Sequence, residues 1–528
     1  MTAVLNVYIM GVTRCIFDFS GSPGYAMICS ISLFILVLWN ATDFIGNCCF
    51  LGDQLDQILH LKYLFKGHWH LLYGPVFSNT SPPVYSLGSI PNLFYGVPSA
   101  LGLNPNQMQF FHMVLISLAG IPLFFKMRKI NLCAGYSYLA ILFTAPIYWW
   151  GLTILWLNNF QLIFSLLFLA GFLHYFEKPS GNRAVLTFGI WLLAIQIHST
   201  PLMAAPLAII PIIHIIACRK RCSLKLNFGS LLFLAALIAP YILAECLSSF
   251  QNTKAIALYF AQSGQKASTD AGYVAAVKAF QNLFGFIELS APSLQLEATG
   301  SWQNLLKWCL PLVFCAWLLV RFFKSMGRIF RSQWNALDIL WLGIFLSLGL
   351  QFIFFLAVKR EIMGPQYVIF SAPMIICLWA GFFGDLLSRA FKKSEIAVLA
   401  TSCLAIILLF PHRTTRIDRS DWNFDHAYAA VKEVCDRSRS FQAPNQPAFT
   451  GYQDYYENLF TYVAHTYFED CRVTATADNL LLPDRGSLPP KILNYKGEHW
   501  RRVKVMKPQI ALYERVSTAK SDSRTKLR

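Results

Sequence analysis

Two acidic residues and a histidine share one face of a helix predicted near the start of the chain. Asp53, Asp56 and His60 follow one another at spacings of three and four residues, and the apolar residues between them fall on the opposite face. A carboxylate can take a proton from a hydroxyl group or hold a divalent cation. We expect this helix to lie at the membrane surface with its acids directed into a cleft. The alternative is a pair of solvated acids at a helix N-terminus, where negative charge is favoured.

A second set of candidate residues could bind a phosphate group. Lys359 and Arg360 stand at the predicted outer end of an apolar segment, and Tyr367 follows them. Fixed cations at such a place can neutralise a phosphate. They could instead reach out to lipid head groups, as long basic side chains do at membrane surfaces. Lys62, next to the acidic helix, is a further candidate for the phosphate.

Several uncharged polar residues are candidates for contact with a substrate. Gln196 and His198 interrupt a long apolar stretch, and Asn158 and Asn159 precede another. Polar residues at membrane depth are functional candidates, although packing inside the bundle is an equal alternative for the histidine. His60 could belong to a metal site with two nearby histidines, but no other ligand pattern accompanies them, and we interpret them as surface residues.

Composition places the chain among membrane proteins that cross the bilayer many times. Of its 528 residues, 55% are hydrophobic and only 13% are charged, and the mean hydropathy is +0.46. Soluble proteins carry nearly twice that charged fraction. The net charge of +17 could suggest nucleic acid as a partner. Much of that charge lies in short clusters between apolar runs, as the positive-inside rule predicts, so we expect no nucleic-acid partner.

The apolar runs predict about 11 membrane-spanning helices. The predicted spans are 26–45, 108–125, 133–149, 155–176, 185–197, 202–217, 228–247, 305–322, 337–358, 367–387 and 396–410. The connections expected on the cytoplasmic side are basic, at 126–129, 177–183, 219–225, 321–331 and 389–393. This pattern puts the N-terminus inside and the tail outside. It also favours two crossings over 185–217, because a single crossing would move the later basic clusters to the wrong side.

We therefore predict a mainly α fold, a polytopic helix bundle over 1–411 with a small external α/β domain over 412–516. The external loops of the bundle are 46–107, which contains the acidic helix, and 248–304, and we expect 517–528 to be disordered. Cys435 and Cys471 are the only cysteines of the hydrophilic tail. They could form a disulfide if the tail faces an oxidising compartment, and the sequence leaves this open.

Short motifs occur along the chain in a distinctive order. They are GDQLD at 52–56, Lys66-Gly67, Tyr73-Gly74-Pro75, the Pro82-Pro83 pair, QIHSTP at 196–201 and KREIMGPQYVIFSAP at 359–373. With these motifs, roughly the first 410 residues resemble the GT-C glycosyltransferases, membrane enzymes that take a sugar from a polyprenyl-phosphate carrier. The resemblance is to the bacterial branch related to aminoarabinose transferase, protein O-mannosyltransferases and rhizobial lipopolysaccharide sugar transferases.

The resemblance implies a role for each set of residues. The acid of the first external loop acts on the acceptor hydroxyl, which corresponds to Asp53, with Asp56 as a second candidate. Many relatives have another acid in the loop before the fourth span, where this chain has Asn158 and Asn159. Dependence on a divalent metal such as Mg²⁺ or Mn²⁺ is therefore in doubt.

The function expected is transfer of a sugar from a polyprenyl-phosphate donor to an envelope glycan, a glycolipid such as lipid A or lipopolysaccharide, or a protein. The expected location is a bacterial inner membrane, with the tail and the active site on the periplasmic side. Alternatives are a secondary transporter or flippase of a lipid-linked sugar, and a non-catalytic envelope scaffold. A transporter should show inverted repeats and charges at the bilayer midplane. This sequence has no evident repeat and concentrates its acids outside the spans.

Overall fold

The structure is a computed structural model that describes most of the predicted spans and parts of the tail. The described residues are chiefly 90–153, 157–217, 226–263, 301–331, 336–358, 369–390 and 424–442, the strands between 479 and 515, and short pieces within 31–45, 72–88, 274–277 and 468–477. They fall into two compact units. The first includes Leu61–Val97 and Phe111–Ile417, and the second includes Pro98–Phe110 and Asp418–Arg528.

The first unit is built from helices. They are α4 (Leu93–Ala100), α5 (Pro105–Ile130), which begins in the second unit, α6 (Leu132–Thr144), α7 (Pro146–Thr153), α8 (Phe160–Glu177), α9 (Gly181–Ile197), α10 (Ala205–Ala217), α11 (Phe228–Leu247), α12 (Gln251–Ser263), α14 (Ser301–Phe330), α15 (Ala336–Val358) and α16 (Ala372–Ala390). Short 3-10 turns precede α4, α8 and α10, at η3 (Ile90–Asn92), η4 (Leu157–Asn159) and η5 (Thr200–Ala204). Strands β1 (Val76–Ser78) and β2 (Val84–Tyr85) pair antiparallel.

Five of the described helices are long and apolar enough to cross a membrane. These candidate spans are Pro105–Ile130, Leu157–Glu177, Phe228–Leu247, Ala336–Leu356 and Ala372–Arg389. Leu132–Thr144, Gly181–Ile197 and Thr200–Ile216 are shorter apolar helices. The chain is thus a helical membrane bundle, as its composition predicts. About half of the predicted span 26–45 and all of the predicted span 396–410 lie outside the described residues.

Local chemistry explains where two helices begin and end. Asn131 accepts a hydrogen bond from the backbone N–H of Ala134 and so caps the first turn of α6. The predicted span 133–149 is wrong at its far end, because α6 stops at Thr144. Pro146 follows Ala145, and the residue before a proline is disfavoured in helical geometry. The chain restarts there as the separate helix α7.

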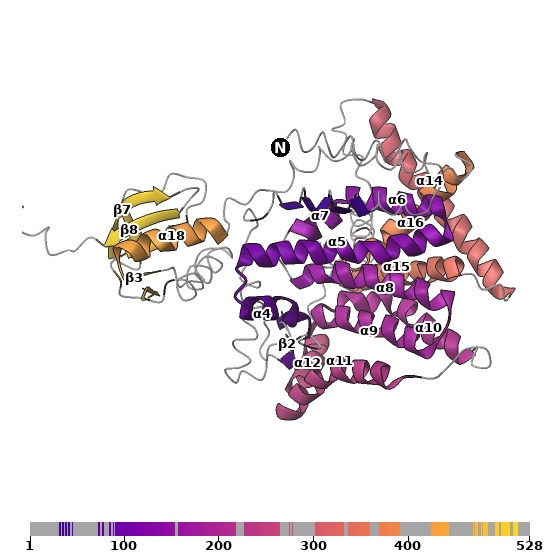
Figure 1. The fold of residues 1–528 in the computed structure, drawn as a ribbon, viewed down its shortest axis with the longest axis horizontal. Helices are drawn as coiled ribbons and strands as arrows, with labels where there is room; N and C mark the ends of the chain where they lie inside the picture. The colour runs from indigo at the N-terminus through magenta and orange to yellow at the C-terminus, as the bar shows by residue number, and fades with distance from the viewer. Residues whose placement is uncertain are drawn as a thin grey trace, which may run out of the picture. The chain divides into compact units, whose positions relative to one another are not determined.

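The chain reverses between α9 and α10, as two crossings require. At the start of α9, Arg183 donates a hydrogen bond to the backbone carbonyl of His174, with 2.9 Å between the atoms. Near the end of α10, His214 Nδ1 lies 2.9 Å from the hydroxyl of Tyr175. Both contacts are with the last turns of α8, so α10 returns to the end of the bundle from which α9 departs. Figure 1 shows α8, α9 and α10 side by side.

The described basic connections gather at one end of the bundle, which we call the basic end. Glu177 at the end of α8 forms ion pairs with Lys126 (2.5 Å) and Lys129 (3.2 Å) at the end of α5. The backbone N–H of Asn227, which precedes α11, donates to Asn182 Oδ1 in the first turn of α9. The ends of helices from distant parts of the sequence are therefore fixed together here.

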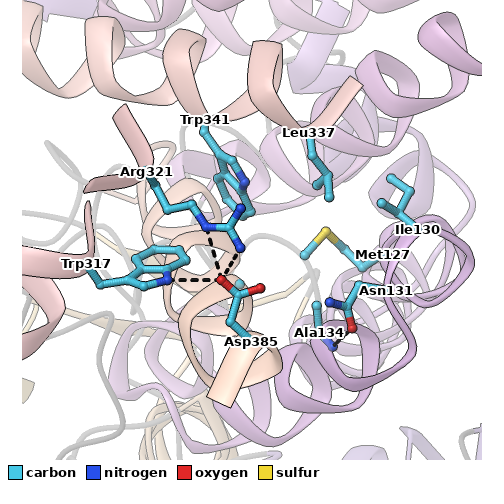
Figure 2. Close-up of a pocket in the computed structure, with 10 residues that line it drawn as sticks. Met127, Ile130, Asn131, Ala134, Trp317, Arg321, Leu337, Trp341 and Asp385 are labelled. Atoms are coloured by element: carbon cyan, nitrogen blue, oxygen red, sulfur yellow. Dashed lines mark hydrogen bonds and ion pairs between the residues drawn. The ribbon is translucent and has the colours of Figure 1, made fainter. Parts of the chain in front are cut away.

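The same end also joins α14, α15 and α16. Arg321 of α14 forms an ion pair with Asp385 of α16, which also accepts a hydrogen bond from Trp317 Nε1 at 3.0 Å (Figure 2). Further along α14, Arg328 lies 3.2 Å from Asp338 in the first turn of α15. Since α16 also packs against α6, the basic segments of all these helices share one end.

The second unit contains the described elements of the tail. Helix α18 (Phe424–Arg437) precedes β3 (Ser440–Phe441), which pairs in parallel with β4 (Arg472–Val473). Strands β5 (Asn479–Pro483), β6 (Ile492–Tyr495), β7 (Glu498–Met506) and β8 (Ile510–Arg515) form an antiparallel sheet in the order β5-β8-β7-β6. Cys435 and Cys471 form a disulfide, which settles the pairing that the sequence leaves open. The predicted disordered segment 517–528 lies outside the described residues.

Candidate functional site

The structure describes four of the residues that the sequence singles out. Gln196, His198, Asn158 and Asn159 all lie at the end of the bundle opposite the basic end, because α8 starts and α9 ends there. The remaining candidates lie outside the described residues. They are Asp53, Asp56, His60, Lys62, Lys359, Arg360 and Tyr367.

A hydrogen bond joins the break after α9 to the start of α8. The hydroxyl of Thr200 donates to Oε1 of Gln161, with 3.1 Å between the oxygens, and both side chains are buried. Gln161 follows Asn159 by two residues, in the first turn of α8. The segments that contain the two predicted pairs, Asn158 with Asn159 and Gln196 with His198, are therefore brought together. We call Asn159, Gln161, Gln196, His198 and Thr200 the polar cluster.

The break after α9 is held in place by further hydrogen bonds. Trp191 of α9 donates from Nε1 to the backbone carbonyl of Pro201 at 2.7 Å. The backbone N–H of Thr200 donates to Nδ1 of His198 at 3.2 Å. Because a backbone amide can only donate, Nδ1 acts as the acceptor, and the neutral ring of His198 carries its proton on Nε2. Burial lowers the pKa of His198 to about 4, so the ring is neutral at physiological pH.

Gln196 connects the break to the first loop and to α11. Its Nε2 donates to the backbone carbonyl of Leu237 at 2.7 Å. Gly88 of the predicted first external loop lies against the same amide, since a Cβ placed on Gly88 would be 2.5 Å from Gln196 Cδ. Only a residue without a side chain allows this approach. The described part of the first loop thus borders the polar cluster.

The end of the late motif also borders α8. Ser165 of α8 donates a hydrogen bond of 2.5 Å to the backbone carbonyl of Phe370. The next residue, Ser371, donates to Oε1 of Gln351 in α15 at 2.7 Å. The motif that contains the predicted phosphate ligands therefore ends beside the first half of α8, near the polar cluster.

A buried histidine packs the neighbouring segments around the start of α8. His112 of α5 donates from Nε2 to the backbone carbonyl of Gly151 in α7 at 2.8 Å, since a carbonyl can only accept. Its Nδ1 then accepts the hydroxyl of Tyr95 in α4 at 2.9 Å. Both rings lie against Phe160, the first residue of α8. These contacts fix α4, α5 and α7 around the helix that begins the polar cluster.

The tyrosine of the Tyr73-Gly74-Pro75 motif and a buried acid lie near the end of α11. Tyr73 donates to the backbone carbonyl of Ala244 at 3.1 Å. The adjacent Glu245 is 3% exposed, and its Oε1 accepts the backbone N–H of Thr253 in the first turn of α12 at 3.1 Å. A carboxylate at a helix N-terminus is a common stabilising arrangement, so we assign Glu245 a capping role.

The polar cluster offers hydrogen bonds without charge. Asn159, Gln161, Gln196 and Thr200 are uncharged side chains, and His198 is neutral. Such a set can orient hydroxyl groups, but it supplies neither a proton-accepting carboxylate nor a cation for phosphate. In the part of the chain that the structure describes, no group of three His, Cys, Asp or Glu residues could hold a metal ion.

A cavity of the bundle lies at the basic end, away from the polar cluster. It is lined by residues that include Met127, Asn131, Trp317, Arg321 and Asp385 (Figure 2). Its volume of roughly 30 Å³ accommodates about one water molecule. A space of that size does not admit a sugar, and the ion pair on its wall already neutralises its charges. We interpret it as part of the helix packing.

Sequence reasoning missed three polar residues at the end of the bundle that carries the polar cluster: Gln161, Ser165 and His112. Each is a single polar residue within an apolar run, and all three are buried. The signal that could have found them is their position at membrane depth, where a polar side chain needs a partner. Their partners come from segments 39 to 205 residues away in sequence, which only the fold reveals.

The fold is similar to that of a solved membrane protein. No known family model and no curated protein matches the chain. The structure is similar to the crystal structure of ArnT from Cupriavidus metallidurans bound to undecaprenyl phosphate, with a TM-score of 0.50 over 94% of this chain and 99% of that chain. Only 10% of the residues are identical. The resemblance that the motifs indicate is thus confirmed at the level of the fold.

Proposed function

We propose that this chain is an integral membrane glycosyltransferase that uses a polyprenyl-phosphate sugar as its donor. The observation that carries the proposal is the fold it shares with ArnT, whose structure holds undecaprenyl phosphate. The placement of the motifs supports it, because the break at Thr200 and the late motif at Phe370 border α8, and the first loop at Gly88 borders Gln196 at the end of α9. A site for one reaction requires such convergence from distant segments.

In the proposed reaction, the acceptor hydroxyl oxygen bonds to the anomeric carbon of the sugar. The bond between that carbon and the phosphate oxygen breaks, and the lipid phosphate leaves with the electron pair. Asp53 takes the proton of the hydroxyl, with Asp56 as the second acid. Lys359 and Arg360, with Tyr367 and Lys62, bind the phosphate and stabilise the charge that develops on it. The lipid-linked sugar enters between helices from the membrane.

A divalent metal would have to be held by the two acids together with Asn158 and Asn159. Amide oxygens can coordinate Mg²⁺ or Mn²⁺ but bring no negative charge, so this ligand set is weaker than one with a third carboxylate. A bound metal would make the acceptor hydroxyl a better nucleophile. We assign the proton transfer to Asp53 whether or not a metal is bound.

The proposed location is a bacterial inner membrane, with the reaction on its external side. The disulfide between Cys435 and Cys471 supports an external tail, because disulfides persist in oxidising compartments. The common basic end supports a cytoplasmic position for that end of the bundle, and so an external position for the end that carries the polar cluster. The acceptor is then an envelope glycan, lipid A or lipopolysaccharide, or an exported protein.

Release of the lipid phosphate tests this proposal. Purified protein in nanodiscs is incubated with a panel of undecaprenyl-phosphate sugars and with envelope extract as the acceptor, and free undecaprenyl phosphate is measured. We expect release that requires both donor and acceptor. Movement of intact donor across a vesicle membrane without release would instead identify a transporter or flippase. Failure to bind or convert any donor would contradict both activities.

A further inference from the structure

We propose that Gln161 and Gln196 bind hydroxyl groups of the donor sugar, and that this sugar carries no charge. The inference rests on the proposed function and adds to it the chemical class of the sugar. Both residues are uncharged amides in the polar cluster. Each uses one of its two polar atoms to hold the fold and, among the described residues, has the other unused; these two atoms are complementary.

Gln161 supplies a hydrogen-bond donor, its side-chain N–H₂ group. Its side chain is 0% exposed, and its Oε1 already accepts the hydroxyl of Thr200. Its Nε2 has no hydrogen-bond partner among the described residues. An amide N–H₂ that is removed from water without a partner is costly, and most such groups in proteins are satisfied by a ligand, a water or another residue. The fold thus leaves a fixed donor near the start of α8.

Gln196 supplies a hydrogen-bond acceptor, its side-chain oxygen. Its side chain is 4% exposed, and its Nε2 already donates to the carbonyl of Leu237. In the described part of the chain, its Oε1 makes no hydrogen bond. The close approach of Gly88, whose Cβ would lie 2.7 Å from this oxygen, fixes the amide in place. The oxygen is therefore held ready to accept a hydrogen bond.

A sugar hydroxyl can satisfy either atom, because it both donates and accepts hydrogen bonds. Among the described residues, a protonated amino sugar in the polar cluster would meet only neutral groups, and a buried cation without a carboxylate is strongly disfavoured. The described side chains of the polar cluster likewise include no cation for a phosphate, whose proposed ligands are Lys359 and Arg360. Asn159, the third amide of the polar cluster, is uncharged as well. The chemistry of the cluster therefore favours a neutral hexose or pentose.

The test compares three lipids on the purified full-length protein in nanodiscs at pH 7. They are undecaprenyl phosphate, the same lipid carrying glucose or arabinose, and the same lipid carrying 4-amino-arabinose. We expect the neutral sugar lipids to bind at least tenfold more tightly than the amino sugar lipid. Gln161→Ala should weaken binding of the neutral sugar lipids about tenfold and change the affinity for undecaprenyl phosphate less than twofold. Unchanged binding of the bare lipid shows that the variant is folded.

A second variant tests charge directly. Gln196→Glu places a carboxylate beside the proposed sugar and should shift preference toward the amino sugar lipid by at least tenfold. Asn182→Ala is the matched control, because Asn182 is an amide of the same helix whose oxygen accepts hydrogen bonds at the basic end. It should leave the preference among the three lipids unchanged.

The outcomes separate the inference from the proposed function. Equal or tighter binding and turnover of the amino sugar lipid in the wild type would overturn the neutral sugar but leave the glycosyltransferase standing. Equal affinity of Gln161→Ala and wild type for every sugar lipid would show that these amides bind only water or nothing. Lack of binding and turnover with all the sugar lipids would overturn the proposed function, and the inference with it.

Discussion

The hydroxyl of Thr200 donates a hydrogen bond to Gln161 Oε1 across 3.1 Å and so ties the break after α9 to the first turn of α8. The two residues are 39 positions apart in the sequence, and both are buried. This contact places the QIHSTP motif and the first turn of α8 in one polar cluster. The site proposed here depends on it, because Gln161 can orient a ligand only while its own amide is held.

Thr200→Val removes this hydrogen bond and keeps the shape of the side chain. We expect a loss of about 1–2 kcal/mol in the free energy of unfolding, because the carbonyl of Gln161 is left buried without its donor. Affinity for a neutral sugar lipid should also fall, whereas affinity for undecaprenyl phosphate should not. Thermal unfolding and lipid titration measure the two effects. Thr200→Ser keeps the hydroxyl and should behave like the wild type. If the valine and serine variants have the same stability and lipid affinity, the hydrogen bond between Thr200 and Gln161 has no role in the site.

Gly88→Ala should displace the amide of Gln196. The added methyl group would lie 2.5 Å from Gln196 Cδ, so the side chain must move and its bond to Leu237 is strained or lost. We expect turnover to fall several-fold with little loss of expression. Gly327→Ala is the control, because a methyl group there meets no atom within 4 Å. If both alanine variants retain wild-type turnover, Gln196 has no role in the reaction.

The bundle should lose stability as the pH falls through the range in which His198 remains neutral. Burial lowers the pKa of His198 from 6.5 to about 4 in the folded state. Between these values the unfolded chain binds a proton that the folded chain does not, so stability is complete above about pH 6.5 and decreases toward pH 4. The loss should be on the order of 1–2 kcal/mol, less than the full pKa shift corresponds to, because the side chain of His198 is only partly buried. His198→Gln should reduce the change of melting temperature with pH in this range. An unchanged pH dependence in this variant would contradict the assignment to His198.

The disulfide should stabilise the tail and indicates that the tail lies in an oxidising compartment. Cys435→Ser combined with Cys471→Ser removes a bond between residues 36 positions apart and should destabilise the tail by roughly 3–4 kcal/mol. In intact cells, neither thiol of the wild type should react with a maleimide before reduction. Reaction of both thiols without reduction would place the tail in a reducing compartment and would contradict the proposed topology.

The sequence was sufficient to predict the reversal near Thr200 and the gathering of basic connections at one end. Both follow from general physical rules, the first from a polar and proline-containing break and the second from the distribution of lysine and arginine. Helix α11, predicted at 228–247, has the same bounds in the structure. These features are local or statistical, so they need no knowledge of contacts.

The partners of individual polar residues were beyond sequence reasoning. Gln161 lies in an apolar run with no motif around it, and its bond to Thr200 depends on how α8 and α9 pack. The separation of α6 from α7 was missed although Pro146 signals it, because the apolar run continues through the proline. The helix predicted around Asp53 and the cations Lys359 and Arg360 lie outside the described residues and stay predictions.

Loss of lipid-phosphate release in Asp53→Asn tests the central claim most directly. Wild type, Asp53→Asn and Asp56→Asn are incubated with the same undecaprenyl-phosphate sugar and acceptor, and free undecaprenyl phosphate is quantified along with donor affinity. We predict that Asp53→Asn binds the donor like the wild type but releases at least a thousandfold less lipid phosphate, since its amide cannot accept the hydroxyl proton. Release by Asp53→Asn near the wild-type rate would contradict the mechanism.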